Sequence, residues 1–220
     1  MKPFPDCTVY HMEQRSPEWI EARRGILTAS MVGAWIMDTK GGVVATKARE
    51  SAICGLIASE AKAWESPNYE NAAMQRGIEL EPIAVSAFEK GTGKKVAQVG
   101  FCRSIHGRFG CSPDGLIYED GTGLEGKVPE PKKHIEYRRA GELPSEYRLQ
   151  VEMSMAVTGA PAWWFQAFNP GLAPFRILIE RTKETDDLLG ELKRFSIQLE
   201  VALKEEAAAW NEADQKGWIV

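Results

Sequence analysis

Two short segments near the middle of the chain, residues 112–115 (Ser-Pro-Asp-Gly) and 124–127 (Leu-Glu-Gly-Lys), constrain its fold most strongly. The Pro-Asp-Gly run is a turn signal, and residues 120–123 (Asp-Gly-Thr-Gly) form a second one between two short apolar stretches. Two such stretches joined by a glycine-containing turn predict a β-hairpin. In this hairpin the carboxylate of Asp114 would lie beside that of Glu125.

The same segments bring together side chains that suit metal chemistry. Residues two apart on a strand point to the same face, so Glu125 and Lys127 would share the face that Asp114 approaches. Carboxylate oxygens are hard ligands that prefer Mg²⁺ or Mn²⁺ to soft metals. A lysine beside such a metal can position an attacking water, while the metal neutralises charge that builds up on a phosphate. The pattern therefore indicates metal-dependent hydrolysis of a phosphodiester.

A simpler interpretation of the motif is a solvated surface hairpin. Asp-Gly and Glu-x-Lys are common in exposed hairpins, where a Glu–Lys pair contributes little to stability. The flanking residues are apolar, however, which predicts partly buried strands: Leu116, Ile117, Leu124 and Val128. A buried glutamate without a partner or a metal is costly. Burial therefore favours the metal site, while the short motif by itself is compatible with both interpretations.

Length and composition are those of one globular domain spanning residues 1–220. The chain has 220 residues, of which 44% are hydrophobic and 26% charged, as is ordinary for a soluble domain. No apolar run approaches the ~20 residues that a membrane helix needs. The N-terminal residues also lack the apolar core of a signal peptide. We therefore expect a cytoplasmic protein with no membrane partner.

The distribution of charge favours local contact with nucleic acid. The formal net charge of −4 argues against a general nucleic-acid coat protein, which would be basic overall. Positive charge is instead clustered at Arg23-Arg24, Lys132-Lys133 and Arg138-Arg139. Local basic stripes on an acidic protein suit a groove, although each cluster alone is also typical of a solvated helix face.

The four cysteines, at positions 7, 54, 102 and 111, have no spacing typical of a metal site. We expect reduced thiols, with Cys54 and Cys111 as small core residues. Their scatter along the sequence also argues against an iron–sulfur nuclease, which would need four clustered cysteines.

The expected elements follow the order helices, strands, helix, two strands, helix. Helix signals cover residues 16–24, 28–36, 45–64 and 71–90, and the last of these is expected to bury Ile83, Ala84, Ala87 and Phe88. Strand patterns follow at 95–102, 109–118 and 123–129, then a helix at 145–157, strands at 162–168 and 175–180, and a long amphipathic helix. This order predicts an α/β or α+β domain with a central mixed sheet flanked by helices.

Five spaced blocks of the chain carry a resemblance to known proteins: residues 23–30, Arg76-Gly77 with Glu81, and residues 111–116, 123–127 and 150–155. In this order the blocks resemble the PD-(D/E)xK nuclease superfamily and, within it, the phage lambda exonuclease (YqaJ viral recombinase) family. The resemblance runs from about Glu18 to the final helix. It implies a restriction-endonuclease-like core.

The resemblance also implies roles for the hairpin residues. Asp114, Glu125 and the backbone carbonyl of Gly126 would hold a catalytic Mg²⁺, with Mn²⁺ as a substitute. Lys127 would orient or activate the attacking water.

Two helical residues would complete this site. Glu81 would approach the metal through water or as a further carboxylate, and Gln150 would support the lysine and the water. Without the resemblance, Glu81 reads as an exposed helical acid and Gln150 as an ordinary polar residue of an amphipathic helix.

By the same resemblance, Arg23 and Ser30 would bind the phosphate at the 5′ end of the strand being degraded. The residues themselves make sense of this role, because backbone N–H groups near a helix N-terminus favour a phosphate and an arginine can clamp it with two hydrogen bonds. The alternatives are that Ser30 is only a helix cap and that Arg23 pairs with Glu18 or Glu21 on its own helix.

Two positions depart from the family pattern. Gly126 replaces a bulky apolar residue between the glutamate and the lysine, which keeps the backbone ligand but loosens strand packing. Glu152 stands where the phage enzyme has a second glutamine, which is expected to add negative charge near the site.

The function that follows is a Mg²⁺-dependent 5′→3′ exonuclease on linear double-stranded DNA. It would release mononucleotides and leave a 3′ single-stranded tail for recombination by strand annealing. The resemblance further implies a ring-shaped homotrimer, a single-strand annealing protein as partner, and a phage or prophage origin in a bacterial host. The alternatives are a PD-(D/E)xK endonuclease that cuts internally and an inactive DNA-binding recombination module.

Overall fold

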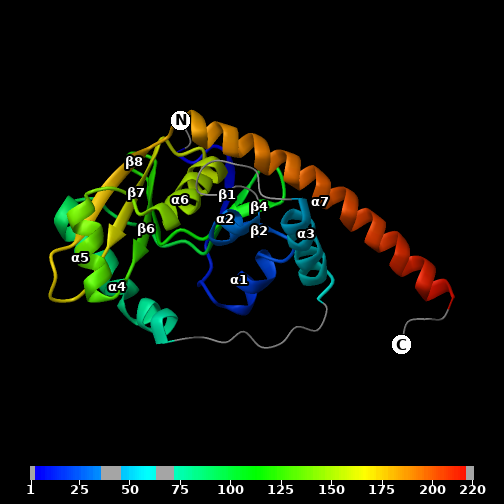
Figure 1. Ribbon diagram of the computed structural model, residues 1–220, viewed down its shortest axis with the longest axis horizontal. Coiled ribbons are helices and arrows are strands. Elements are labelled where there is room, and N and C mark those ends of the chain that lie inside the picture. Colours follow the sequence, from blue (N-terminus) through cyan, green and yellow to red (C-terminus); the bar gives the residue numbers. More distant parts are fainter. Residues whose placement is uncertain (1–2, 36–45, 63–71, 217–220) are drawn as a thin grey trace.

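The computed structural model describes residues 3–35, 46–62 and 72–216. Within these residues the strands form two four-stranded mixed sheets, and helices pack around them (Figure 1). This arrangement confirms the expected α/β class with mixed sheets flanked by helices. The strands are divided between two sheets, however, and do not form one central sheet.

The first sheet has the strand order β1-β3-β4-β2. Its members are β1 (Cys7–Tyr10), β2 (Leu27–Thr28), β3 (Phe101–Ser104) and β4 (Phe109–Cys111). β3 pairs antiparallel with both β1 and β4, whereas β2 lies parallel to β4. Both β1 and β2 lie outside the expected strands, and they form the two edges of this sheet.

The second sheet has the order β5-β6-β7-β8, and it contains the expected hairpin. Strands β5 (Gly115–Ile117) and β6 (Thr122–Lys127) are antiparallel, with Gly115 opposite Leu124. β6 is parallel to β7 (Ala162–Ala167), which in turn is antiparallel to β8 (Phe175–Glu180), as expected for that pair.

The chain passes from one sheet to the other through Ser112, Pro113 and Asp114. The single strand expected over residues 109–118 is in fact two strands, β4 and β5, that belong to different sheets. Proline has no N–H to donate to a strand ladder, so Pro113 favours an interruption at this point. The crossing places Asp114 directly before β5, with one sheet on each side.

The helices surround the two sheets (Figure 1). They are α1 (Pro17–Ala22), the 3₁₀ helix η1 (Ala29–Met31), α2 (Val32–Trp35), α3 (Thr46–Glu60), α4 (Ala72–Thr92), α5 (Pro131–Ala140), α6 (Ser145–Thr158) and α7 (Lys183–Gln215). The helix expected over 28–36 is thus η1 followed by α2. Its last residue, Ile36, and the last residue of the helix expected over 45–64, Trp64, lie outside the described residues. No described helix is apolar over a length that could cross a membrane.

Helix α6 is central to the packing, because it contacts strands of both sheets as well as α7. Its residues 151–158 are all buried. They pack in a core with large side chains of β7 and α7, including Trp163, Leu192 and Phe195. Burying one such side chain contributes roughly 1.5–3 kcal/mol. The helix is therefore a rigid support for any residue at its start that points toward the sheets.

Three burial expectations are wrong. Ile83 on α4 is 53% exposed and Ala87 is only partly buried, whereas Ala84 and Phe88 on the same helix are buried. Residues 84 and 88 are one helical turn apart and mark the face that packs inward, and Ile83 lies about 100° away from that face. Cys54 on α3 is exposed and is not a core residue.

The other three cysteines gather in the first sheet although they are scattered in the sequence. Cys7, Cys102 and Cys111 are buried thiols on the neighbouring strands β1, β3 and β4. A hydrogen bond with Cys111, together with burial, raises the pKa of the Cys102 thiol. A raised pKa disfavours the thiolate that would bind a metal. With Cys54 on the surface, the described residues contain no four-cysteine cluster for an iron–sulfur centre.

Candidate active site

The hairpin brings Asp114 to strand β6 as expected. The Asp114 N–H donates to the carbonyl oxygen of Leu124 at 3.1 Å, which extends the β5–β6 ladder by one residue. In return, the Gly126 N–H donates to Asp114 Oδ2 at 2.6 Å. The carboxylate of Asp114 is therefore held next to the backbone that carries Glu125 and Lys127.

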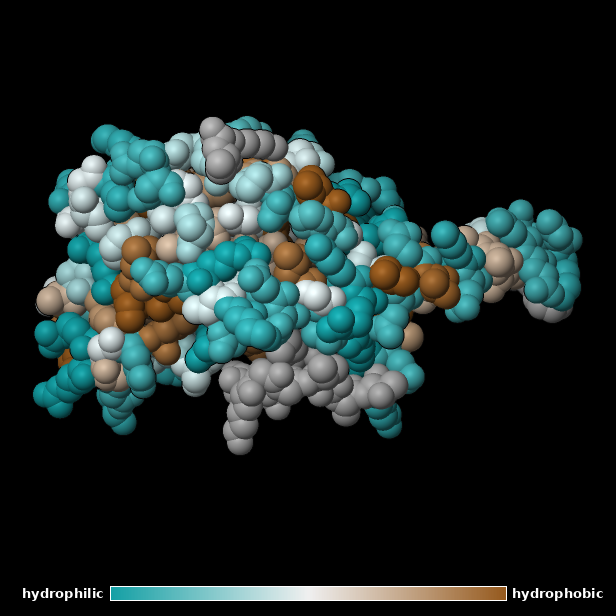
Figure 2. Space-filling model, turned by 90° about the horizontal axis from the view of Figure 1, so that it is seen from above, coloured by the Kyte–Doolittle hydropathy of each residue, from teal (hydrophilic) through white to brown (hydrophobic). Residues whose placement is uncertain are grey.

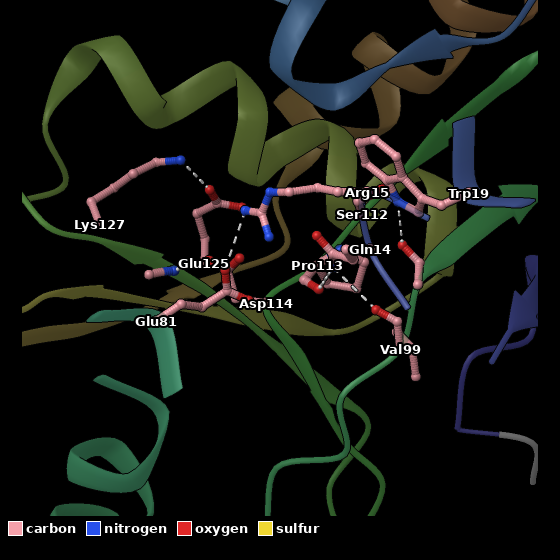
Figure 3. Close-up of polar contacts among 12 residues, drawn as sticks. Gln14, Arg15, Trp19, Glu81, Val99, Ser112, Pro113, Asp114, Glu125 and Lys127 are labelled. Carbon is pink, nitrogen blue, oxygen red and sulfur yellow. Dashed lines mark hydrogen bonds and ion pairs between the residues drawn. The ribbon is translucent and has the colours of Figure 1, made fainter. Parts of the chain in front are cut away.

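Glu125 is the buried centre of the site. Its side chain is almost fully buried, and its Oε1 accepts hydrogen bonds from Lys127 Nζ at 2.5 Å and from Gln150 Nε2 at 2.7 Å. Figure 3 shows the lysine reaching Glu125 along the same face of the strand. The predicted shared face of Glu125 and Lys127 is confirmed. Gln150 comes from α6, and it supports the glutamate directly.

The charges at this point are unbalanced. Burial and the neighbouring Glu125 raise the pKa of Asp114 to about 8, although Lys127 acts in the opposite direction. Burial opposes the charge of Lys127, but Glu125 and Asp114 outweigh it and raise the pKa of the lysine. Lys127 is thus a firmly protonated cation, and it does not fully compensate the two carboxylates.

Glu81 approaches the same site from α4. Its charge is a further, smaller cause of the raised pKa of Asp114. Its Oε2 lies 3.4 Å from Nη2 of Arg15, and Figure 3 shows the Arg15 side chain extended toward the carboxylates of Glu81, Asp114 and Glu125. The structure therefore brings the predicted Glu81 to the hairpin, where its direct partner is an arginine.

The donor set fits a hard divalent cation. Mg²⁺ keeps several waters and is usually bound by one or two carboxylates together with substrate phosphates, so Asp114 and Glu125 suffice. Burial, followed by the charge of Glu125, raises the pKa of Asp114, and a bound cation would favour its ionised form. No three His, Cys, Asp or Glu side chains in the described ranges form a closed metal-binding group.

A large cleft runs past these residues. It has a volume of about 1190 Å³ and is lined by residues from distant parts of the sequence, among them Arg15, Arg23, Glu81, Asp114 and Lys127. The cleft is large enough for a nucleotide strand, since small-molecule pockets are ~300–1,000 Å³. Its basic residues and its carboxylates face one common space.

Arg23 also lines this cleft, and its contacts are with an aromatic ring and hydroxyl groups. Its guanidinium carbon lies 3.8 Å from the centre of the Trp19 ring, and the guanidinium donates to Ser112 Oγ at 3.5 Å and to Thr28 Oγ1 at 3.4 Å. Burial lowers its pKa to about 10. No carboxylate of the described residues forms an ion pair with it. A partly buried cation without a counter-ion favours an anionic ligand.

Ser30 is linked to this arginine indirectly. Its Oγ lies 3.3 Å from Thr28 Oγ1, which accepts from Arg23. Ser30 lies in the short η1 helix and is exposed, and the cleft is lined by Thr28 and Arg23 but not by Ser30 among the described residues. The structure therefore gathers the two predicted residues into one cluster and puts Thr28 between them.

In the described residues, neither of the alternative partners of Arg23, Glu18 and Glu21, forms an ion pair with it. Glu21 pairs with Arg24 at 2.8 Å and with Lys62 at 2.9 Å, and no ion pair joins Glu18 to Arg23 within the described residues. The expectation for Glu152 is also corrected. This residue is buried and its Oε2 accepts from Thr185 Oγ1 on α7, so its charge faces the core and not the cleft.

Three residues of the site were outside the sequence-based expectation. Ser112 accepts from both Arg23 and the Trp19 indole, the latter at 2.9 Å. Gln14 donates to the carbonyl oxygen of Pro113 at 2.9 Å, directly before Asp114. The position of Ser112 beside Pro-Asp was a usable signal, whereas Trp19 and Gln14 act across more than 90 residues of sequence and gave none.

Comparison with known proteins agrees with this geometry. The model of the YqaJ-like viral recombinase domain family matches residues 18–161. An alkaline exonuclease from Laribacter hongkongensis is 30% identical, and the alignment covers 91% of this chain and 99% of the exonuclease with a TM-score of 0.72. The same enzyme in complex with dAMP gives 30% identity, coverage of 90% and 99%, and a TM-score of 0.74.

A phage-related exonuclease from Haemophilus somnus 129PT shares the fold. It is 13% identical, with coverage of 83% of this chain and 96% of that protein and a TM-score of 0.60. No curated protein sequence matches the chain significantly.

The raised pKa of Asp114 predicts that the metal-free protein is less stable at pH 8 than at pH 5. Between the ordinary aspartate value of 3.8 and about 8, the folded protein holds a proton that the unfolded chain releases. The free energy of unfolding must therefore fall as pH rises through this window. Urea unfolding in EDTA across this range measures the slope, and Asp114→Asn should flatten it.

The matched control is Asp187→Asn, which removes an exposed aspartate paired with Lys183 on α7. Its slope should equal that of the wild type. An Asp114→Asn slope equal to that of the wild type would contradict the assigned charge imbalance.

Proposed function

The chain belongs to the YqaJ-like viral recombinase domain family, and from this premise and the geometry of its cleft we propose that it is a Mg²⁺-dependent exonuclease. Its substrate is linear double-stranded DNA, of which it degrades one strand in the 5′→3′ direction. It releases mononucleotides and leaves a 3′ single-stranded tail. Membership and the exonuclease relatives support the nuclease activity, and the residues of the cleft support the finer assignment.

One observation carries the proposal. The carboxylate of Asp114, the ammonium of Lys127 and the guanidinium of Arg23 all border the same cleft, and the buried carboxylate of Glu125 pairs with Lys127 at 2.5 Å. Carboxylates with a lysine are suited to hydrolysing a phosphodiester, and an arginine without a counter-ion is suited to binding a phosphate. A single strand of DNA presents to such a cleft both a phosphodiester that can be hydrolysed and a phosphate that the arginine can bind.

Each residue then has a defined task. Asp114 and Glu125, with the backbone carbonyl of Gly126, would hold the Mg²⁺ or Mn²⁺, and Glu81 would approach it directly or through water. When bound, the metal supplies a Lewis acid that lowers the pKa of water and stabilises charge on the phosphate. Lys127, kept protonated by its carboxylate neighbours, orients the attacking water.

Gln150 has a positioning task. Its hydrogen bond to Glu125 Oε1 fixes the orientation of that carboxylate, and the buried body of α6 fixes Gln150. Orientation of this kind lowers the cost of reaching the reactive geometry.

The proposed 5′→3′ direction of degradation rests on Arg23 and the hydroxyl groups around it. Arg23 contacts Ser112, and Ser112 is separated from the ligand Asp114 only by Pro113. A terminal phosphate bound by Arg23, with Ser112, Thr28 and Ser30 nearby, would leave the following phosphodiester near the carboxylates. The complex of the Laribacter enzyme with dAMP, a nucleoside monophosphate, supports mononucleotides as products.

The remaining parts of the proposal draw on the family alone. A viral recombinase domain fits a protein of phage or prophage origin that acts in the cytoplasm of a bacterial host. We include a ring-shaped homotrimer that encloses the duplex, and a single-strand annealing protein that takes over the 3′ tail.

The activity is tested on linear and closed circular duplexes of the same sequence. We expect Mg²⁺-dependent release of mononucleotides from the linear duplex, no cutting of the circle, and no reaction in EDTA. An endonuclease would cut the circle, and an inactive binding module would leave both substrates intact. Either outcome contradicts the proposal.

Lys127→Ala is expected to lower the cleavage rate by about 10²-fold or more, because removing one preorganised charged donor from an active site costs this much. DNA affinity should change little, so binding and cleavage are measured separately. The matched control is Lys132→Ala, which removes an exposed lysine of α5 and should cleave as the wild type does. Retained cleavage by Lys127→Ala would exclude the assigned site.

Arg23→Gln is expected to abolish the preference for a 5′-phosphorylated end. Loss of a charge-assisted contact corresponds to about a tenfold effect on that preference. Initial rates on duplexes with and without a 5′ phosphate give the ratio for each variant. Arg138→Gln, an exposed arginine on α5, should keep the wild-type ratio. A wild-type enzyme indifferent to the 5′ phosphate would refute the role of Arg23 and leave the hairpin site intact.

A further inference from the structure

We propose that Arg15 binds a phosphate of the DNA strand at the carboxylate site, and that Glu81 holds its guanidinium there before DNA arrives. This inference rests on the proposed function and extends it to a residue that the sequence motifs did not include.

The backbone of Arg15 has a conformation that arginine rarely adopts. The N–H of Ser16 donates to the carbonyl oxygen of Glu13 at 3.2 Å, which closes a tight turn with Gln14 and Arg15 as its central residues. Arg15 has a φ of 72°. A turn with positive φ at its third position normally has glycine or asparagine there. Arginine at such a position is a local cost, and such costs cluster at functional sites.

The turn is fixed on both sides of Arg15. On one side, the Gln14 side chain donates to the carbonyl oxygens of Val99 at 3.1 Å and of Pro113 at 2.9 Å. On the other side, Ser16 caps helix α1 by accepting from the N–H of Trp19 at 3.2 Å. The contact with Pro113 ties the turn to the residue before Asp114. The position of Arg15 relative to Asp114 is therefore fixed through the contact of its neighbour Gln14 with Pro113.

From this turn the Arg15 side chain enters the cleft. Figure 3 shows it extended toward the carboxylates, and it lines the same cleft as Asp114 and Lys127. The ion pair of Arg15 with Glu81, the only one it forms among the described residues, is long at 3.4 Å, and the Arg15 side chain is 47% exposed. Exposed pairs of this kind contribute little to stability. The guanidinium can therefore exchange Glu81 for a stronger partner.

A phosphate of the substrate is such a partner. The planar guanidinium presents paired N–H donors that match phosphate oxygens, and this contact is stronger than a single long bond to a carboxylate. Arg23 is assigned to the terminal phosphate. Arg15 would instead contact a phosphate beside the hairpin carboxylates, where DNA must come close for cleavage.

The competing explanation is structural. Arg15 and Glu81 would then only join the N-terminal turn to α4, and the pair would matter for stability alone. Substitution by glycine separates the two explanations. Glycine relieves the left-handed backbone, so Arg15→Gly should keep or raise the melting temperature if the side chain serves DNA, and lower it if the side chain serves the fold.

The experiment compares wild type, Arg15→Gly, Arg15→Lys and Lys62→Gly. Lys62 is the other non-glycine residue with positive φ in the described ranges, at 53°, and it is an exposed cation paired with Glu21. It does not line the cleft, so Lys62→Gly is matched in charge and in backbone relief. Affinity for a 5′-phosphorylated duplex is measured in Ca²⁺ over a range of salt concentrations, with intact DNA verified afterwards. Cleavage in Mg²⁺ and melting temperatures are measured in parallel.

We expect Arg15→Gly to bind the duplex about tenfold more weakly and to lose about one unit of salt-dependence slope. Cleavage should fall, the melting temperature should not, and Arg15→Lys should recover part of the affinity. Lys62→Gly should match the wild type in affinity and slope.

Wild-type affinity and slope in Arg15→Gly would overturn the inference. So would a loss of affinity that accompanies a lower melting temperature and that Arg15→Lys does not restore. A wild type that neither binds nor cleaves linear duplex would instead refute the proposed function, so the two failures are distinguishable.

Discussion

The hydrogen bond from the Gly126 N–H to Asp114 Oδ2 is the contact on which the site depends. Asp114 ends the crossing between the two sheets, and Gly126 lies within β6, so the bond locks the crossing to the hairpin. A hydrogen bond of 2.6 Å in a partly buried place, where water competes little, is a strong and well-defined contact. It fixes the carboxylate without using the second oxygen, which stays available to a ligand.

The packing of the core determines the orientation of the residues of the site. Helix α6 packs against both sheets and α7, and the buried residues 151–158 directly follow Gln150, which holds Glu125. Any change that shifts α6 must therefore shift the orientation of the central carboxylate. The packing of the core, together with the hydrogen bond from Gly126 and the ion pair of Glu125 with Lys127, keeps Asp114 and Glu125 close together.

The sequence predicted the parts of the site that depend on local periodicity. Glu125 and Lys127 share a face because they are two apart on a strand, and the turn at 120–123 places Asp114 opposite them. The interruption at Pro113 was misjudged, because the apolar residues on both sides read as one strand. Helix α5 was missed since only His134 and Tyr137 of its ten residues are buried, too few for an apolar stripe.

Contacts between residues far apart in the sequence could not be predicted from it. Gln14 meets Pro113, and Trp19 meets Ser112, through the folded arrangement of the first sheet and its neighbours. No local pattern marks a glutamine amide that will cap a carbonyl in a distant loop. The left-handed backbone of Arg15 is likewise invisible in a sequence, because arginine at that position contradicts the usual preference of the turn.

The short crossing from Ser112 to Asp114 limits the distance between these two residues. Two peptide units of extended chain span at most about 7 Å, and Pro113 removes much of their remaining freedom. In the proposed enzyme Ser112 contacts Arg23, which would bind the 5′-terminal phosphate, and Asp114 would hold the metal. The length of the released product would then be set by the backbone distance between Ser112 and Asp114. It would not depend on the base sequence that passes through the cleft or on how many copies of the chain assemble.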